Sequence, residues 1–137
     1  MAEDQTPDMG RIPGVTPYLT VNGGKAAIAF YEAAFGAVVL FVKDAQDGHR
    51  IMHATLEING GALMLSDNFT EFMGEMTPPA SVTLHLQVHD ADVWWDRAVA
   101  AGATIRMPLE DQFWGDRYGQ LTDPFGHTWA IGGPKKG

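Results

Sequence analysis

The chain has 137 residues, no cysteine and a formal net charge of −8. Its length predicts one domain that folds without disulfides, and the missing thiols exclude disulfide bridges, thiolate metal sites and cysteine nucleophiles. The acidic balance argues against nucleic acid as a partner, and no apolar run approaches the ~20 residues that span a membrane. The N-terminal residues lack the apolar core of a secretory signal, so we expect a cytoplasmic protein.

The first half of the chain predicts a strand, a helix and further strands. Alternating apolar and polar residues predict strands over 16–21, 52–59 and 62–66. Four residues at helical spacing mark the buried face of a helix between the first two strands: Ala27, Phe30, Tyr31 and Ala34. We expect Asn22 to cap the start of this helix and Gly36 to end it.

The second half repeats this pattern, which indicates two copies of one unit. A strand is predicted over 82–89, followed by a helix that Asp90 caps and Gly102 ends. Five residues form the predicted stripe of this helix: Val93, Trp94, Arg97, Ala98 and Ala101. Trp95 lies beside the stripe, where it would sit at its edge or meet another chain.

These elements predict an α+β fold of two tandem β-α-β-β-β modules. The expected divisions are a tail over 1–12, modules over 13–66 and 81–132, an inter-module loop over 67–80 and a C-terminal tail over 133–137. Each strand would bury its apolar face under a helix and leave a polar face outside. Two such sheets that curl together would line a shared groove with those polar faces. In the loop, Phe69, Phe72 and Met73 would cover a ligand or pack on a partner subunit.

The duplicated unit resembles the vicinal oxygen chelate superfamily, which includes glyoxalase I, fosfomycin and bleomycin resistance proteins, and extradiol dioxygenases. Five segments within residues 14–132 are similar to its PhnB-like branch: Tyr18–Val21, Phe30–Gly36, Ala98–Ala103, Trp114–Gly119 and Asp123–His127. The resemblance implies paired modules that form a cupped mixed sheet, and a homodimer.

Enzymes of this superfamily hold a divalent metal with His, Gln or Glu side chains on inward-facing strand positions. The resemblance transfers these positions to Thr16, Met64, Thr83 and Ala130, the last in place of the glutamate of the final strand. None of these side chains suits a hard or borderline cation, which prefers imidazole or carboxylate. We therefore expect no metal and no cofactor.

Polar and aromatic side chains on the inward strand phase are the candidate ligand-binding groups. They are Tyr18, His53, Glu57, His85, Phe113, Trp114, Tyr118 and Gln120. Two histidines and a glutamate could make a divergent metal site, or they could be hydrogen-bonded residues of a cavity wall. The aromatic residues could line a pocket or simply pack in the core. Arg117 could recognise an anionic ligand or pair with an acidic neighbour.

Three functions remain open at this point. The first is a metal-free module that binds a small amphipathic or aromatic molecule. The second is a divalent-metal-dependent lyase or isomerase of the glyoxalase type, with divergent ligands His53, His85 and Glu57. The third is a structural dimer with another protein as its partner, which an exposed Trp95 and Trp114 would favour. We favour the first, because the metal-ligand positions have lost their ligands.

Overall fold

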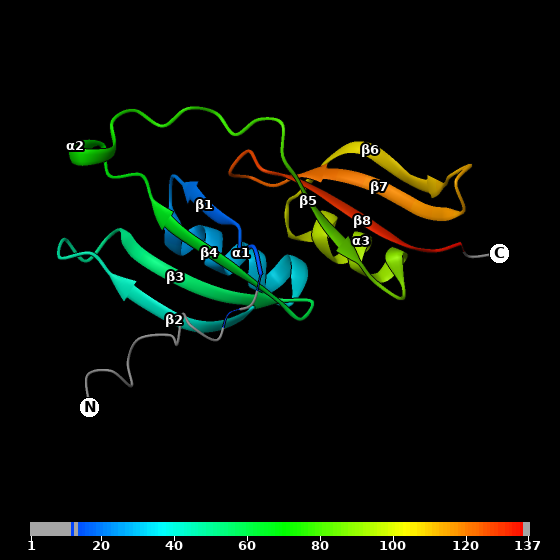
Figure 1. The fold of residues 1–137 in the computed structure, drawn as a ribbon, viewed down its shortest axis with the longest axis horizontal. Helices are drawn as coiled ribbons and strands as arrows, with labels where there is room; N and C mark the ends of the chain where they lie inside the picture. Colours follow the sequence, from blue (N-terminus) through cyan, green and yellow to red (C-terminus); the bar gives the residue numbers. More distant parts are fainter. Residues whose placement is uncertain (1–11, 13, 136–137) are drawn as a thin grey trace. The chain divides into compact units, whose positions relative to one another are not determined.

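Two four-stranded mixed sheets, each with one long helix, make up the fold (Figure 1). The computed structural model describes residue 12 and residues 14–135. The chain divides into two units between Met76 and Thr77, and the second unit also takes in Ala33–Phe35. The order of elements confirms the predicted α+β class and the two β-α-β-β-β modules.

The first unit builds its sheet in the strand order β1-β4-β3-β2. Its elements are β1 (Tyr18–Val21), α1 (Gly24–Phe35), β2 (Val38–Asp44), β3 (Ile51–Ile58) and β4 (Gly61–Asp67). β1 runs parallel to β4, and the other neighbouring strands are antiparallel. α1 covers one face of the sheet (Figure 1). The predicted stripe of this helix is confirmed, because all four of its residues are buried: Ala27, Phe30, Tyr31 and Ala34.

The start of α1 differs from the prediction, because Gly23 and not Asn22 is the N-cap residue. The free backbone N–H groups donate instead to the buried carboxylate of Asp67 at the end of β4. Oδ1 accepts from the N–H groups of Gly23 and Gly24 at 2.8 and 3.0 Å, and Oδ2 accepts from Ile51 N at 2.7 Å. A side chain that is distant in sequence therefore replaces the local cap.

A short helix, α2 (Thr70–Met73), follows β4 within the segment predicted as a loop. Phe69 is buried just before it, with the guanidinium of Arg50 4.4 Å from its ring centroid. Arg50 also donates to both carboxylate oxygens of Glu71 at 3.0 and 2.9 Å. Phe72 stacks on Phe69 but stays largely exposed. Of the three predicted covering residues, Phe69 is therefore part of the core, and Phe72 and Met73 lie on the surface.

The second unit has the equivalent strand order β5-β8-β7-β6. Its elements are β5 (Thr83–Gln87), α3 (Ala91–Ala101), β6 (Thr104–Asp111), β7 (Asp116–Thr122) and β8 (Thr128–Pro134). β5 runs parallel to β8, and α3 packs against β8 and β6. Asp90 caps α3 as predicted by accepting from Val93 N at 3.3 Å. Arg117 pairs with acidic neighbours, Asp92 at 2.9 Å and Asp111 at 3.3 Å.

The buried face of α3 differs from the predicted stripe. Its buried residues are Ala91, Trp95 and Ala98, whereas Val93 is 58% exposed. The indole of Trp95 fills the space beside Gly119 of β7, where an added Cβ would lie 2.6 Å from the ring. Ala98 belongs to both sets, but Trp95 rather than Trp94 is the buried tryptophan, because adjacent tryptophans give both faces similar hydrophobicity. Trp95 is thus a core residue of this unit.

The turn between β7 and β8 is organised by the buried carboxylate of Asp123. Its Oδ1 accepts from the backbone N–H groups of Phe125 and His127, each at 2.9 Å. Its Oδ2 accepts from Nε1 of Trp129 at 2.9 Å, and Trp129 itself is buried. The aspartate therefore joins the turn to the core of the second unit.

Candidate functional site

In the first unit, Tyr18 and His53 form a hydrogen-bonded ring pair on the polar side of the sheet. Tyr18 projects from β1 and His53 from β3. The phenol oxygen of Tyr18 lies 2.9 Å from Nδ1 of His53, and the ring centroids are 5.4 Å apart at an angle of 51°. Nε2 of His53 lies 2.9 Å from Oγ1 of the buried Thr55. The ring of Phe41 in β2 flanks His53 at 6.1 Å.

The environment of His53 favours its neutral form. Partial burial lowers the pKa of His53 below its ordinary value of 6.5, because a less polar surrounding disfavours the imidazolium. In the neutral ring one nitrogen donates and the other accepts, and hydroxyl groups stand at both positions. The half-exposed Tyr18 therefore presents a hydroxyl that is already oriented by a neutral histidine.

Glu57 shares the strand phase of His53 but is not part of this pair. It lies opposite Val38 of β2 and Ala62 of β4 and is exposed. No hydrogen bond joins Glu57 to His53 within residues 14–135.

In the second unit, His85 of β5 and Tyr118 of β7 form the corresponding ring pair. Their ring centroids are 5.9 Å apart and the rings are nearly parallel, at 16°. Nε2 of His85 lies 2.8 Å from Oε1 of Gln87, and Nε2 of Gln120 donates to the phenol oxygen of Tyr118 at 2.9 Å.

Two further aromatic residues extend this pair along the hairpin between β6 and β7. The ring of Trp114 lies 5.5 Å from Tyr118, and Phe113 lies 5.1 Å from Trp114. Phe113 and Trp114 are 94% and 51% exposed. The structure thus brings five of the eight predicted residues into one cluster of the second unit: His85, Phe113, Trp114, Tyr118 and Gln120.

The two ring pairs are equivalent in the repeat, with tyrosine and histidine exchanged. Tyr18 pairs in register with Met64 of β4, and His85 pairs with Ala130 of β8. In each unit the second ring comes from the strand on the other side of this inner strand. His53 comes from β3, beyond β4, and Tyr118 comes from β7, beyond β8. In each sheet a phenol and an imidazole therefore lie on the two sides of one inner strand, β4 in the first sheet and β8 in the second.

The positions that would hold the metal of the superfamily do not fit a metal ion. The hydroxyls of Thr16 and Thr83, the thioether of Met64 and the methyl of Ala130 include no imidazole or carboxylate. Met64 and Ala130 are also buried. Within the part of the chain that the structure describes, no three His, Cys, Asp or Glu side chains are grouped so that they could hold an ion.

Three further residues belong to these clusters but were not predicted: Thr55, Gln87 and Gly132. Thr55 and Gln87 each lie two residues after a histidine on the same face of the strand, so the alternating pattern could have identified them. An added Cβ on Gly132 would lie 3.0 Å from both His85 Cε1 and Gln87 Oε1. Sequence does not reveal that close approach, because it depends on the register between β5 and β8.

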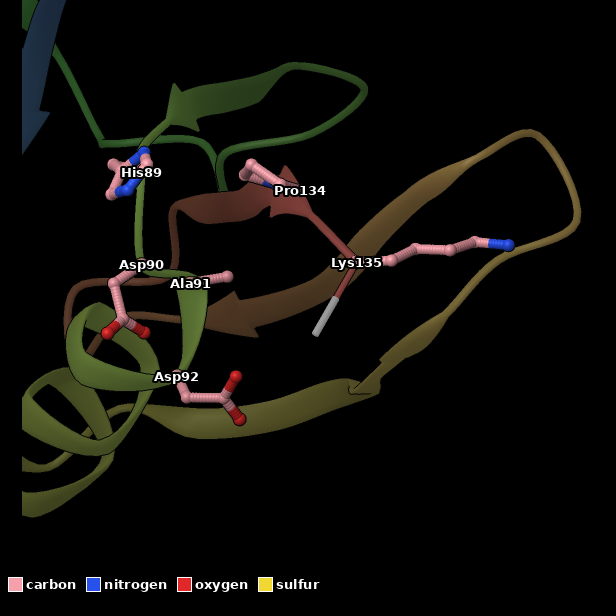
Figure 2. A pocket seen from close by; sticks show the side chains of 6 residues that line it. All are labelled: His89, Asp90, Ala91, Asp92, Pro134 and Lys135. Carbon is pink, nitrogen blue, oxygen red and sulfur yellow. The ribbon is translucent and has the colours of Figure 1, made fainter. Parts of the chain in front are cut away.

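Two pockets lie away from the ring pairs. One, of about 450 Å³, is bordered by the β2–β3 turn and α2 and includes Arg50, Phe69 and Phe72. The other, of about 310 Å³, lies at the start of α3 and the end of β8 (Figure 2). Neither contains one of the eight candidate ligand-binding residues, although the predicted covering residues Phe69 and Phe72 border the first. In the second pocket, Asp90 already caps α3. Asp92 already forms an ion pair with Arg117. We therefore base the candidate site on the ring pairs rather than on these pockets.

Two tandem β-α-β-β-β modules, each with a four-stranded mixed sheet, are the architecture that the resemblance to the vicinal oxygen chelate superfamily implied. A family profile described as the Glyoxalase/Bleomycin resistance protein/Dioxygenase superfamily matches residues 11–131, and the chain belongs to that superfamily.

Three individual proteins are similar to most of this chain. Protein Rv0887c of Mycobacterium tuberculosis strain H37Rv is 46% identical over 128 residues, which cover 89% of this chain and 75% of the relative. The crystal structure of protein PA1353 from Pseudomonas aeruginosa has a TM-score of 0.73 and 27% identity, covering 89% of this chain and 98% of that one. A PhnB protein from Bacillus cereus shares the fold, with a TM-score of 0.68 and 21% identity, covering 87% of this chain and 98% of that one.

Among residues 14–135, none of the helices has the length and apolar character that a membrane span requires.

Proposed function

We propose that the protein binds a small amphipathic or aromatic molecule on the polar faces of its two sheets, without a metal ion. The observation that carries this proposal is the pair of phenol–imidazole contacts, Tyr18 with His53 and His85 with Tyr118. Ligand sites combine apolar and aromatic surface with a few oriented polar groups, and both faces have this composition. Gln120, Phe113 and Trp114 extend it in the second unit.

The hydrogen bonds of the histidines support a binding role over a metal role. Both ring nitrogens of His53 are engaged by hydroxyl groups, and Nε2 of His85 is engaged by Gln87. A metal ion at His53 would displace Tyr18 or Thr55 from its nitrogen. Glu57, the remaining member of the divergent set, is not bonded to His53 in the described chain.

We propose that the protein belongs to the PhnB-like branch of the superfamily and forms a homodimer. The combination of Trp114–Gly119 with Asp123–His127 supports the branch. The dimer is supported by the edge strand β2, on which Val38 and Leu40 are each 54% exposed. Exposed apolar edge strands favour pairing with another chain. Size-exclusion chromatography with light scattering tests this point, and a monomer at micromolar concentration would contradict it.

A thermal-shift screen tests the binding function. The probes are amphipathic antibiotics, sugar phosphates and aldehyde–thiol adducts, which sample neutral aromatic, anionic and glyoxalase-type molecules. A ligand present at ~100 times its Kd stabilises the folded protein by about 2.7 kcal/mol, so a true ligand raises the unfolding temperature measurably. The shift should be smaller in a His53→Ala or a His85→Ala variant. A shift that is unchanged in both variants would place binding elsewhere.

Elemental analysis separates this proposal from the metal-dependent lyase. Protein purified without a chelator should contain far less than one equivalent of manganese, iron, nickel or zinc. One bound equivalent, together with a lyase or isomerase activity that chelation abolishes, would establish the alternative with ligands such as His53, His85 and Glu57.

A further inference from the structure

The side-chain hydroxyl of Thr55 in β3 is buried and has one polar neighbour. Thr55 is fully buried, and its Oγ1 lies 2.9 Å from Nε2 of His53. Within the described part of the chain this is the only hydrogen bond of that hydroxyl. A hydroxyl carries one proton, and a buried donor without an acceptor destabilises the folded state. The burial of Thr55 therefore favours the arrangement in which its O–H donates to Nε2.

This direction determines the tautomer of His53. If Nε2 accepts from Thr55, the proton of the neutral ring is on Nδ1. Nδ1–H then donates to the phenol oxygen of Tyr18, 2.9 Å away. In the opposite tautomer Thr55 would be the acceptor, and its own buried proton would have no acceptor among the described residues. The chain of hydrogen bonds therefore runs from Thr55 through His53 to Tyr18.

The O–H group of Tyr18 is at the exposed end of this chain. Tyr18 is half-exposed, and among the described residues its hydroxyl is hydrogen-bonded to His53 alone. Because the phenol oxygen accepts from Nδ1–H, the phenol proton is available to a bound molecule. An acceptor oxygen on a ligand would complete the chain.

A positive charge lies beside the same ring pair. Lys43 of β2 is directly opposite His53 in the register, so the two side chains share a face, with Cβ atoms roughly 5 Å apart. Lys43 is exposed, and its side chain forms no ion pair or hydrogen bond in the described part of the chain. Phe41, two residues earlier in β2, adds an aromatic ring whose centroid is 6.1 Å from that of His53. A carboxylate attached to an aromatic ring matches this combination of groups.

We infer that the first unit binds the carboxylate of an aromatic acid through the O–H of Tyr18 and the ammonium group of Lys43. Thr55 is a positioning residue, which acts by setting the tautomer of His53. This inference rests on the proposed binding function and adds the class of ligand.

The tautomer of His53 can be measured without any ligand, by long-range proton–nitrogen NMR correlation at about pH 8, where the imidazole is neutral. The unprotonated nitrogen resonates far downfield of the protonated one, and we expect it to be Nε2 in the wild type. Thr55→Val removes the donor, keeps the shape of the side chain and should increase the Nε2–H form, which free imidazole side chains prefer. Thr55→Ser keeps the hydroxyl and should retain the wild-type tautomer. Protonation of wild-type His53 at Nε2, or an unchanged tautomer in Thr55→Val, would refute the role of Thr55.

The ligand class is tested by calorimetric titration of naphthoate, with naphthamide as an uncharged molecule of the same shape. We expect the wild type to bind naphthoate more tightly than naphthamide. Tyr18→Phe should weaken naphthoate binding about tenfold, the scale of one lost hydrogen bond to a charged group. Lys43→Met should weaken it by roughly twofold to fivefold, as expected for an exposed ion pair.

Lys25→Met is the matched control for the charge. It removes an exposed lysine of the same unit, whose Nζ donates to the carbonyl oxygen of Gly48, and changes the net charge equally. This variant should bind naphthoate as the wild type does. An equal loss in Lys25→Met and Lys43→Met would refute a local role of Lys43.

Two results would overturn the inference as a whole. One is wild-type protein that binds naphthamide as tightly as naphthoate, and the other is wild-type protein that binds no naphthoate. In either case, hits of the thermal-shift screen that depend on His53 or His85 would still support the proposed function. The failure of the ligand class and the failure of the proposed function are therefore distinguishable.

Discussion

The phenol oxygen of Tyr18 lies 2.9 Å from Nδ1 of His53, across β4, the strand between β1 and β3 in the first sheet. The second sheet places a histidine where the first has its tyrosine, and a tyrosine where the first has its histidine. Duplication accounts for the shared strand positions, whereas the exchange gives the two faces different polar groups. The first carries a hydroxyl next to a neutral imidazole, and the second carries two nearly parallel rings that are hydrogen-bonded to glutamine side chains.

The first prediction concerns the pH dependence of stability. Burial lowers the pKa of His53 in the folded protein, so the unfolded chain takes up this proton at higher pH. The stabilising effect of the neutral ring is therefore present above about pH 6.5 and declines as the pH falls toward the folded pKa. Urea unfolding at about pH 7.5 and about pH 5.5 should show a smaller decrease of stability in His53→Gln than in the wild type.

The pH range of this effect distinguishes His53 from Asp47 and Glu71, the two carboxyl groups whose pKa values are lowered. The backbone N–H of Arg50 helps to hold the pKa of Asp47 well below its usual range, and the side chain of Arg50 lowers the pKa of Glu71. Their contributions are present above about pH 4 and are lost only below it. An equal pH dependence in wild type and His53→Gln would show that His53 does not titrate differently on folding.

The second prediction compares two helix caps. Asp67 accepts three backbone N–H groups, two of them in buried hydrogen bonds, whereas Asp90 accepts one N–H at an exposed helix start. Asp90→Ala should cost about 1 kcal/mol of unfolding free energy, as N-cap removal usually does. Asp67→Ala leaves several donors without a partner and should cost more than about 3 kcal/mol. Urea unfolding of both variants gives the ranking, and the reverse order would refute the role of Asp67.

The third prediction concerns the contact between Trp95 and Gly119. An added Cβ on Gly119 would lie 2.6 Å from the indole and 2.8 Å from the backbone Cα of Leu109. Gly119→Ala should therefore destabilise the protein by about 1–3 kcal/mol, the usual range for overpacking a core. Gly61→Ala, which introduces no such contact, serves as the matched control in thermal unfolding. Equal unfolding temperatures for the two variants would mean that Trp95 does not pack against β7.

The fourth prediction separates the two functions of Asp123. Asp123→Asn keeps an oxygen for the N–H groups of Phe125 and His127 but presents an amide nitrogen to Nε1 of Trp129. Asp123→Ala removes both sets of hydrogen bonds. Each lost partner of a buried donor costs about 1–3 kcal/mol, so the Ala variant should be the less stable one. In a Trp129→Phe background the cost of Asp123→Asn should largely disappear, and a full cost there would contradict the assigned contact.

Sequence patterns predicted the elements that depend on local periodicity. The stripe of α1 was correct because Phe30 and Tyr31 mark one face of the helix, with Ala27 and Ala34 one turn before and after them. In the stripe of α3, Ala98 was correct, but the choice of tryptophan was wrong, because Trp94 and Trp95 are adjacent and only the packing against Gly119 decides between them. The start of α1 was wrong for a similar reason, since Asp67 is far from Gly23 in sequence.

The sequence predicted which face of its strand each residue of the candidate site occupies, but not which of these residues contact one another. Tyr18, His53, His85 and Tyr118 were recognised from alternation, which assigns a face to each strand residue. Alternation does not give the register between strands, which decides that Tyr18 meets His53 and that Glu57 does not. The close approach of Gly132 to His85 and Gln87 also follows from register, because the residue itself has no side chain that a pattern could detect.

The most direct test of the account is a calorimetric titration of the best thermal-shift ligand into chelator-treated protein. The account predicts saturable binding with the same Kd in the presence of EDTA and in the presence of added manganese, nickel or zinc. Binding that disappears in EDTA and returns with one equivalent of a divalent ion would contradict it.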